Sequence, residues 1–175
     1  MNISSVQFKR ASDLELDIAA SLARWNIEAG DIELELTETV LMEITQKHGD
    51  ALERLQQLGV RIAIDDFGTG YSSLKYLTIY PVNRLKIAQE LVFRVTTDSR
   101  NATVVRAAIR LAQELGIEVI AEGVETEAQA DFLLSAGCPY AQGYYFSRPA
   151  NAERATALLQ QGQIEFTAIP TRVSA

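Results

Sequence analysis

Five ionisable side chains stand in or directly after short apolar runs. Asp65 and Asp66 close Ile-Ala-Ile-Asp-Asp, Glu122 closes Val-Ile-Ala-Glu, and Glu35 and Lys86 lie within Leu-Glu-Leu and Leu-Lys-Ile. Four carboxylates gathered at one place would repel each other unless cations held them, because buried carboxylates must be paired or bound to metal. Adjacent carboxylates can serve two ions that lie close together, an arrangement that cleaves phosphate esters. The lysine could then orient a water or neutralise a phosphate oxygen.

The composition restricts which metal and which partners fit such a site. Cys138 is the only cysteine and His48 the only histidine, so oxygen ligands must hold any ion, which favours magnesium, manganese or calcium over structural zinc. The 16 basic and 23 acidic residues give a net charge of −7, so we expect no general attraction to DNA, RNA or an anionic membrane. Since no apolar run approaches the roughly 18 residues that a membrane span needs, we expect a cytoplasmic protein.

The elements that would position these side chains alternate along the chain. Apolar or β-branched runs are each followed by a segment of helical period. The runs are Asn2–Ser4, Ile32–Thr37, Arg61–Asp66, Arg84–Ala88, Glu118–Gly123 and Tyr140–Phe146. The predicted helices are Asp13–Asn26, Gly49–Leu58, Ser72–Leu77, Ser99–Leu115, Thr126–Ser135 and Asn151–Gln160. Six such repeats predict a parallel sheet with crossover helices, either an open doubly wound sheet or a barrel.

The place of the ionisable residues favours the barrel. They recur near the C-terminal ends of successive runs, and in a barrel those ends meet on one face, where active sites are built. In an open sheet they would spread along an edge. The 175 residues are nevertheless short for an eightfold barrel of about 250. Without a Pro/Ser-rich linker, we predict one domain over residues 1–163, followed by a flexible tail over 164–175.

Simpler structural interpretations compete with the functional one. Glu35 could be a solvated strand residue, Lys86 could extend to the surface, and Glu122 could simply lead into the helix that Thr126 caps. His48 lies in a polar stretch and is expected to be exposed. Two acids that end an apolar strand before Phe-Gly-Thr-Gly are harder to explain without a site.

Together the motifs resemble the EAL family of cyclic-di-GMP phosphodiesterases, which have a TIM-type (β/α) barrel. The segment Asp-Asp-Phe-Gly-Thr-Gly-Tyr-Ser-Ser-Leu from Asp65 onward is similar to the family's DDFGTGYSSL loop without a change. Glu-Leu-Thr-Glu from Glu35, Ala-Glu-Gly-Val-Glu from Ala121 and Gln-Gly-Tyr-Tyr-Phe from Gln142 resemble three further family motifs, and Asn2-Ile-Ser resembles a short metal-binding strand. The likeness spans residues 2–149.

The resemblance implies a two-metal site for Mg²⁺ or Mn²⁺. Its ligands would be Asn2, Glu35, Asp65, Asp66 and Glu122, with Asp65 bridging the two ions. Asp66 and Glu122 would also take part in catalysis. The reaction would be in-line hydrolysis of one phosphodiester, which opens cyclic di-GMP to linear pGpG.

The resemblance also assigns roles around the metals. Lys86 would be catalytic by positioning the attacking water, and Gln142 would bind substrate. Glu38 and Glu125 would stabilise the loop that follows the paired aspartates. That loop, residues 67–74, would support a homodimer.

Two departures from the family pattern predict reduced or lost activity. The sequence holds no Glu-Ala-Leu, so we expect an N-terminally short domain with an incomplete barrel of about six β-α units. The family's Lys-Ile-Asp reads Lys86-Ile87-Ala88, so the aspartate is replaced by a methyl group. Two alternatives stay open: an inactive cyclic-di-GMP receptor or dimerisation module, and an enolase-type barrel enzyme with a lysine base.

Overall fold

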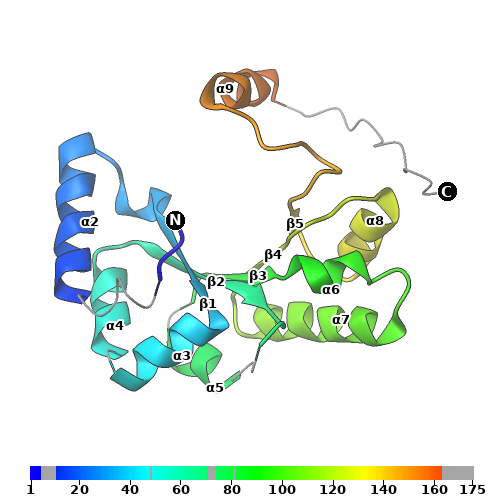
Figure 1. Cartoon of the computed structure of the whole chain (residues 1–175), viewed down its shortest axis with the longest axis horizontal. Helices are drawn as coiled ribbons and strands as arrows, with labels where there is room; N and C mark the ends of the chain where they lie inside the picture. Colours follow the sequence, from blue (N-terminus) through cyan, green and yellow to red (C-terminus); the bar gives the residue numbers. More distant parts are fainter. Residues whose placement is uncertain (5–10, 48, 71–73, 81, 163–175) are drawn as a thin grey trace. The chain divides into compact units, whose positions relative to one another are not determined.

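The computed structural model describes residues 1–4, 11–47, 49–70, 74–80 and 82–162, and these form two compact units (Figure 1). Unit 1 comprises Met1–Lys86 with Leu111–Val119, and unit 2 comprises Ile87–Arg110 with Ile120–Ala175. The predicted tail over 164–175 lies outside the described residues, and so does His48. The single domain over 1–163 stays a prediction.

The strands form one five-stranded sheet whose order follows the chain, β1-β2-β3-β4-β5. The strands are Glu33–Thr37 (β1), Arg61–Phe67 (β2), Arg84–Ile87 (β3), Glu118–Ala121 (β4) and Tyr140–Ala141 (β5). β1 and β2 are parallel in register from Glu33↔Arg61 to Thr37↔Asp65, and β4 and β5 are also parallel. A barrel keeps its strands in chain order, whereas a doubly wound sheet reverses the order at a switch point. The sheet therefore favours the barrel.

The helices connect successive strands, as the alternation of the sequence predicts. Unit 1 holds α2 (Ala11–Trp25), the short η1 (Ala29–Asp31), α3 (Glu38–Lys47), α4 (Gly49–Gln57) and α5 (Leu74–Ile79). Unit 2 holds α6 (Gln89–Phe93), α8 (Glu127–Ser135) and α9 (Ala152–Gln161), while α7 (Ser99–Glu114) runs from one unit into the other. The described helices include none long and apolar enough to cross a membrane.

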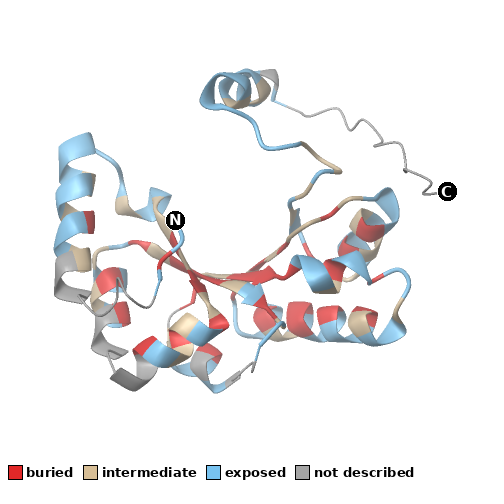
Figure 2. Cartoon of the chain, viewed as in Figure 1, coloured by how far each residue is buried: buried red, intermediate tan, exposed pale blue. Residues whose placement is uncertain are grey.

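The two faces of the unit 1 sheet differ because side chains alternate along a strand. Leu34 and Leu36 of β1 and Ile62 and Ile64 of β2 are buried, and α3 packs on both strands (Figure 2). The alternate positions of β1, β2 and β3 carry the charges, namely Glu33, Glu35, Arg61, Asp65, Arg84 and Lys86. One face thus supplies the core, and the other supplies ionisable groups.

Several elements differ from the sequence-based expectation, among them α3, α6 and β5. Helix α3 was not expected, and it begins directly after β1, where the Thr37 hydroxyl accepts a hydrogen bond from the Val40 N–H at 3.4 Å. The short α6 was also not expected. The run Tyr140–Phe146 is a strand only over Tyr140–Ala141, because the chain turns at Gly143 and Tyr145 N–H bonds back to the Val124 carbonyl at 3.0 Å.

Candidate active site

A buried lysine joins two of the predicted metal ligands within unit 1. Lys86 is 7% exposed, and its ammonium lies 2.9 Å from Asp65 Oδ1 and 3.2 Å from Glu35 Oε1. These residues come from three neighbouring strands, β3, β2 and β1, and all project from the charged face of the sheet. The surface-extended interpretation of Lys86 and the solvated interpretation of Glu35 are both wrong. The cluster places one cation between two carboxylates.

Asn2 lies beside this cluster. It forms an isolated parallel bridge with Glu35, in which Ile3 N–H donates to the Glu35 carbonyl at 3.0 Å and Glu35 N–H donates to the Met1 carbonyl at 2.8 Å. The expected first strand is therefore a single bridge, which pairs the backbone of Asn2 with that of Glu35. Oxygen donors of this kind suit a hard divalent cation.

The chain turns sharply where β2 ends. Asp66 has φ +53°, a left-handed conformation that aspartate tolerates better than most residues, and it is exposed. Two residues later, Gly68 N–H donates a 2.6 Å hydrogen bond to Glu38 Oε1, which comes from the buried start of α3. The Thr69 hydroxyl closes the turn by donating a 2.9 Å hydrogen bond to the Asp66 carbonyl. With this turn, a carboxylate oxygen of Asp66 lies within 4.8 Å of one of Asp65.

Unit 2 contains a second group of predicted site residues. Gln142 Nε2 donates to Glu122 Oε1 at 2.7 Å, and the backbone joins the same two segments through Val124 N–H on the Gln142 carbonyl at 3.0 Å. Gly143 follows at φ +156°, where a Cβ would lie 2.2 Å from the Val124 carbonyl oxygen. Only glycine permits this close approach, which holds the amide of Gln142 against the carboxylate of Glu122.

A hollow of about 440 Å³ opens over this group, within the size range of small-molecule sites. Its ten lining residues all belong to unit 2 and include three predicted site residues, Glu122, Glu125 and Gln142. The others are Gln89, Gly123, Gly143, Tyr144, Ser147, Arg148 and Pro149. The hollow therefore combines two carboxylates, two amides, one aromatic ring and one guanidinium.

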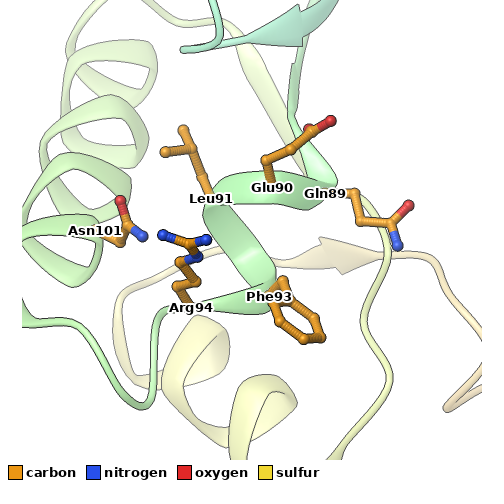
Figure 3. Close-up of a pocket in the computed structure, with 6 residues that line it drawn as sticks. All are labelled: Gln89, Glu90, Leu91, Phe93, Arg94 and Asn101. Carbon is orange, nitrogen blue, oxygen red and sulfur yellow. The ribbon is translucent and has the colours of Figure 1, made fainter.

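A second hollow of unit 2, of about 540 Å³, holds none of the predicted site residues. It is lined by Gln89, Glu90, Leu91, Phe93, Arg94 and Asn101, from α6 to the first turn of α7. Figure 3 shows the Arg94 side chain extending toward Asn101, while Gln89 points away from both. Because its single carboxylate, Glu90, is not among the predicted site residues, we do not assign the chemistry to this hollow.

The opposite ends of the strands carry a charge cluster made by the first residue of four strands, namely Glu33, Arg61, Arg84 and Glu118. Arg84 bonds to Glu33 at 3.0 Å and to Glu118 at 2.8 Å, and Arg61 also bonds to Glu118. The hydrogen bond from Arg84 is the main cause that holds the pKa of Glu118 below its usual value, with Arg61 adding to the effect. Burial acts to lower the pKa of Arg84, but its carboxylate partners outweigh this and raise it. This strand-start cluster serves stability, since barrel active sites lie at the other end.

The structure thus brings Asn2, Glu35, Asp65 and Lys86 together in unit 1, and Glu122 and Gln142 together in unit 2. It also reveals two residues that the sequence reasoning missed, Gln89 and Arg148. Only the position of Arg148, in Ser-Arg-Pro directly after the Gln-Gly-Tyr-Tyr-Phe motif, could have indicated it.

Three other features lie outside these two groups. Cys138 is buried, which raises the pKa of its thiol, and it packs as a small apolar residue. The predicted dimer loop over 67–74 includes residues 71–73, which lie outside the described residues, so the homodimer stays a prediction. Ala88 is buried at the start of α6, where it offers no side-chain cap.

Comparison with known proteins identifies relatives over most of the chain. A model of the EAL domain family matches residues 1–149. The bifunctional diguanylate cyclase/cyclic di-GMP phosphodiesterase MucR of Pseudomonas aeruginosa is 40% identical over 157 residues, which cover 90% of this chain and 23% of MucR. The chain therefore spans about a quarter of the length of this relative.

Solved structures give the same result for the fold. The MucR phosphodiesterase in complex with c-di-GMP has a TM-score of 0.82 at 40% identity, covering 88% of this chain and 62% of that one. The EAL domain of Mycobacterium smegmatis DcpA has a TM-score of 0.86 at 36% identity, covering 94% and 73%. Klebsiella pneumoniae BlrP1, solved with manganese and the same dinucleotide, has a TM-score of 0.80 at 32% identity, covering 86% and 38%. The predicted incomplete TIM-type barrel is confirmed.

Proposed function

This chain belongs to the EAL domain family, and from that premise we propose that it contributes to metal-dependent hydrolysis of cyclic di-GMP to pGpG, with reduced turnover. Relatives whose names include cyclic di-GMP phosphodiesterase support the substrate. Structures of relatives that hold cyclic di-GMP with manganese or calcium support both the ligand and a divalent cation.

The observation that carries the proposal is the position of Lys86. The Lys86 ammonium lies 3.2 Å from Glu35 and 2.9 Å from Asp65. Its burial costs desolvation free energy, which an ion pair at the surface would not cost. A purely structural pair would be satisfied by one carboxylate. The extra acid fits a site where cations are exchanged or shared.

The residues present fit a divalent cation. The predicted ligands are all oxygen donors, which Mg²⁺, Mn²⁺ and Ca²⁺ prefer. Glu35 and Asp65 already surround a positive charge, and the backbone bridge pairs Asn2 with Glu35. We propose that these residues hold the metal together with Asp66 and Glu122. When bound, the ions would lower the pKa of a water and offset charge on the phosphodiester.

The chain's own residues would supply the rest of the chemistry. Lys86, fixed by its two carboxylates, can donate a hydrogen bond from Nζ that orients the attacking water. Gln142 is held by Glu122 at 2.7 Å, so its amide is pre-oriented toward the substrate in the same hollow. Glu38 fastens the backbone of Gly68 and would keep the turn after Asp66 in its left-handed form.

Ala88 is the reason to propose reduced turnover. At this position the family pattern has an aspartate two residues after the catalytic lysine, and a methyl group can neither bind metal nor accept a proton. Losing such a group typically removes a factor of about 10² to 10⁴ in rate. The same observation favours the second candidate, a protein that binds cyclic di-GMP but does not cleave it.

The test is to incubate the chain with cyclic di-GMP and Mn²⁺ and to separate pGpG by chromatography. Slow but measurable product that disappears in Asp65→Asn supports the hydrolase. Binding by calorimetry without product supports the receptor. Asp131→Asn is the matched control, because it neutralises an exposed aspartate of α8 that lines neither hollow. Product formed equally by Asp65→Asn would contradict the assigned site.

A further inference from the structure

Resting on the proposed function, we propose that Arg148 is a specificity-determining residue that reads the acceptor edge of one guanine of the cyclic dinucleotide. The hollow of unit 2 that contains Glu122 and Gln142 has only one lysine or arginine among its described lining residues, and this is Arg148. Arg148 ends the short segment 142–148, which begins with Gln142. A ligand that contacts Gln142 therefore comes within the region that Arg148 lines.

The guanidinium of Arg148 is positioned but has its donors available. Its Cζ lies 5.1 Å from the centre of the Tyr144 ring, so the aromatic face supports it. Among the described residues, no carboxylate forms an ion pair with it, although Glu122 and Glu125 line the same hollow. An arginine held by a ring keeps its N–H groups for a ligand, and less conformational freedom is lost when it binds.

The chemistry of the ligand favours a base over a phosphate at this place. Glu125, which is not among the proposed metal ligands, lines the hollow and would repel a phosphate. A purine instead offers a flat face for Tyr144 and an edge for the guanidinium. Guanine presents two acceptors, O6 and N7, which match the planar arginine fork, whereas adenine presents one acceptor and one donor there. Arg148 would thus distinguish guanine from adenine.

The test measures dissociation constants of cyclic di-GMP and cyclic di-AMP for the full chain by calorimetry in Ca²⁺. Arg148→Ala is expected to raise the dissociation constant of cyclic di-GMP by about 5- to 150-fold, the range that one bidentate contact to guanine contributes. The dissociation constant of cyclic di-AMP should change by less than about twofold. Arg148→Lys keeps the charge but not the fork, so it should recover only a small part of the loss.

The matched control is Arg106→Ala. Arg106 is an exposed arginine of the same unit that also stacks on a ring, 4.4 Å from the centre of Phe132, but it does not line the hollow. It should bind both dinucleotides like the wild type.

Each outcome separates the two proposals. If the wild type binds cyclic di-GMP and Arg148→Ala binds it equally well, Arg148 has no such role, and the proposed function stands. If Arg148→Ala lowers the affinity for both dinucleotides equally, or if Arg148→Lys binds like the wild type, Arg148 provides only positive charge. Either result would overturn the proposal that Arg148 recognises guanine. No binding of cyclic di-GMP by a folded wild type would remove both proposals.

Discussion

The substitution Ala88→Asp tests whether one missing carboxylate limits the chemistry. Ala88 precedes the first residue of α6 with φ −57° and ψ 143°, and its side chain provides no hydrogen bond to the helix. An aspartate at such a position can accept from a first-turn N–H, which typically stabilises by about 0.5–2 kcal/mol. The position is 0% exposed, so added atoms must also be accommodated, at a cost of about 1–3 kcal/mol.

These opposing terms predict a small net effect on folding and a large one on turnover. From the middles of the ranges for capping and crowding, we expect the unfolding free energy to fall by about 0.75 kcal/mol, within limits of about a 1 kcal/mol gain and a 2.5 kcal/mol loss. We expect turnover to rise by at least about tenfold, because a restored acid or base usually contributes 10²–10⁴. The assay is pGpG formation with Mn²⁺, together with urea unfolding of the same preparations.

Ala88→Asn separates the two effects, since asparagine caps a helix as well as aspartate does but carries no charge. It should match Ala88→Asp in stability and the wild type in turnover. If Ala88→Asp folds normally and cleaves no faster, or if Ala88→Asn gives the same gain, the missing carboxylate is not what limits this chain.

Three further changes test other parts of the molecule. Lys86→Met leaves two partly buried carboxylates without their ammonium, so in EDTA it should lower the unfolding free energy by about 1–3 kcal/mol. Mn²⁺ should raise its melting temperature more than that of the wild type; an equal rise would contradict a shared cation site. The pKa of Glu118 is held below its ordinary value of 4.5, chiefly by Arg84, so its contribution to stability is complete above that value and is lost as the pH falls through the lower pKa of the folded state. In Glu118→Gln, the unfolding free energy measured with urea should therefore fall less between pH 6 and pH 3 than in the wild type. The difference should be below about 1 kcal/mol because the side chain is 40% exposed. An unchanged pH dependence would contradict a stabilising role of this cluster. Gly143→Ala places a Cβ against the Val124 carbonyl and should lower stability by about 1–3 kcal/mol and weaken cyclic di-GMP binding measured by calorimetry; normal binding would show that this close approach is not required.

The strands and their ionisable ends could be predicted because local signals coincide there. Apolar runs such as Arg61–Asp66 are short and end in acids followed by glycines, and strand β2 covers that run and one further residue. The parallel arrangement followed from the intervening helices. The Glu38–Gly68 contact was expected only through the family resemblance, since it joins residues 30 apart.

Features set by packing between distant segments were not predictable. The burial of Lys86 depends on β1 and β2 lying beside β3, and a lysine flanked by apolar residues is equally typical of a surface position. The length of β5 depends on how closely Gly143 approaches Val124, which no local propensity encodes. Arg148 was missed because a single arginine before a proline has no distinctive spacing.

The strand-start cluster also fixes how neighbouring strands align during folding. A one-residue slip of β2 against β1 would move Arg61 to the helix-covered face and leave Glu118 with one guanidinium fewer. The same slip would turn the buried Ile62 and Ile64 onto the charged face, so burial and charge favour the same register. In that register Asp65 pairs with Thr37, close to Glu35 on the adjacent strand. A misaligned sheet would therefore lose its core packing and its strand-start ion pairs together.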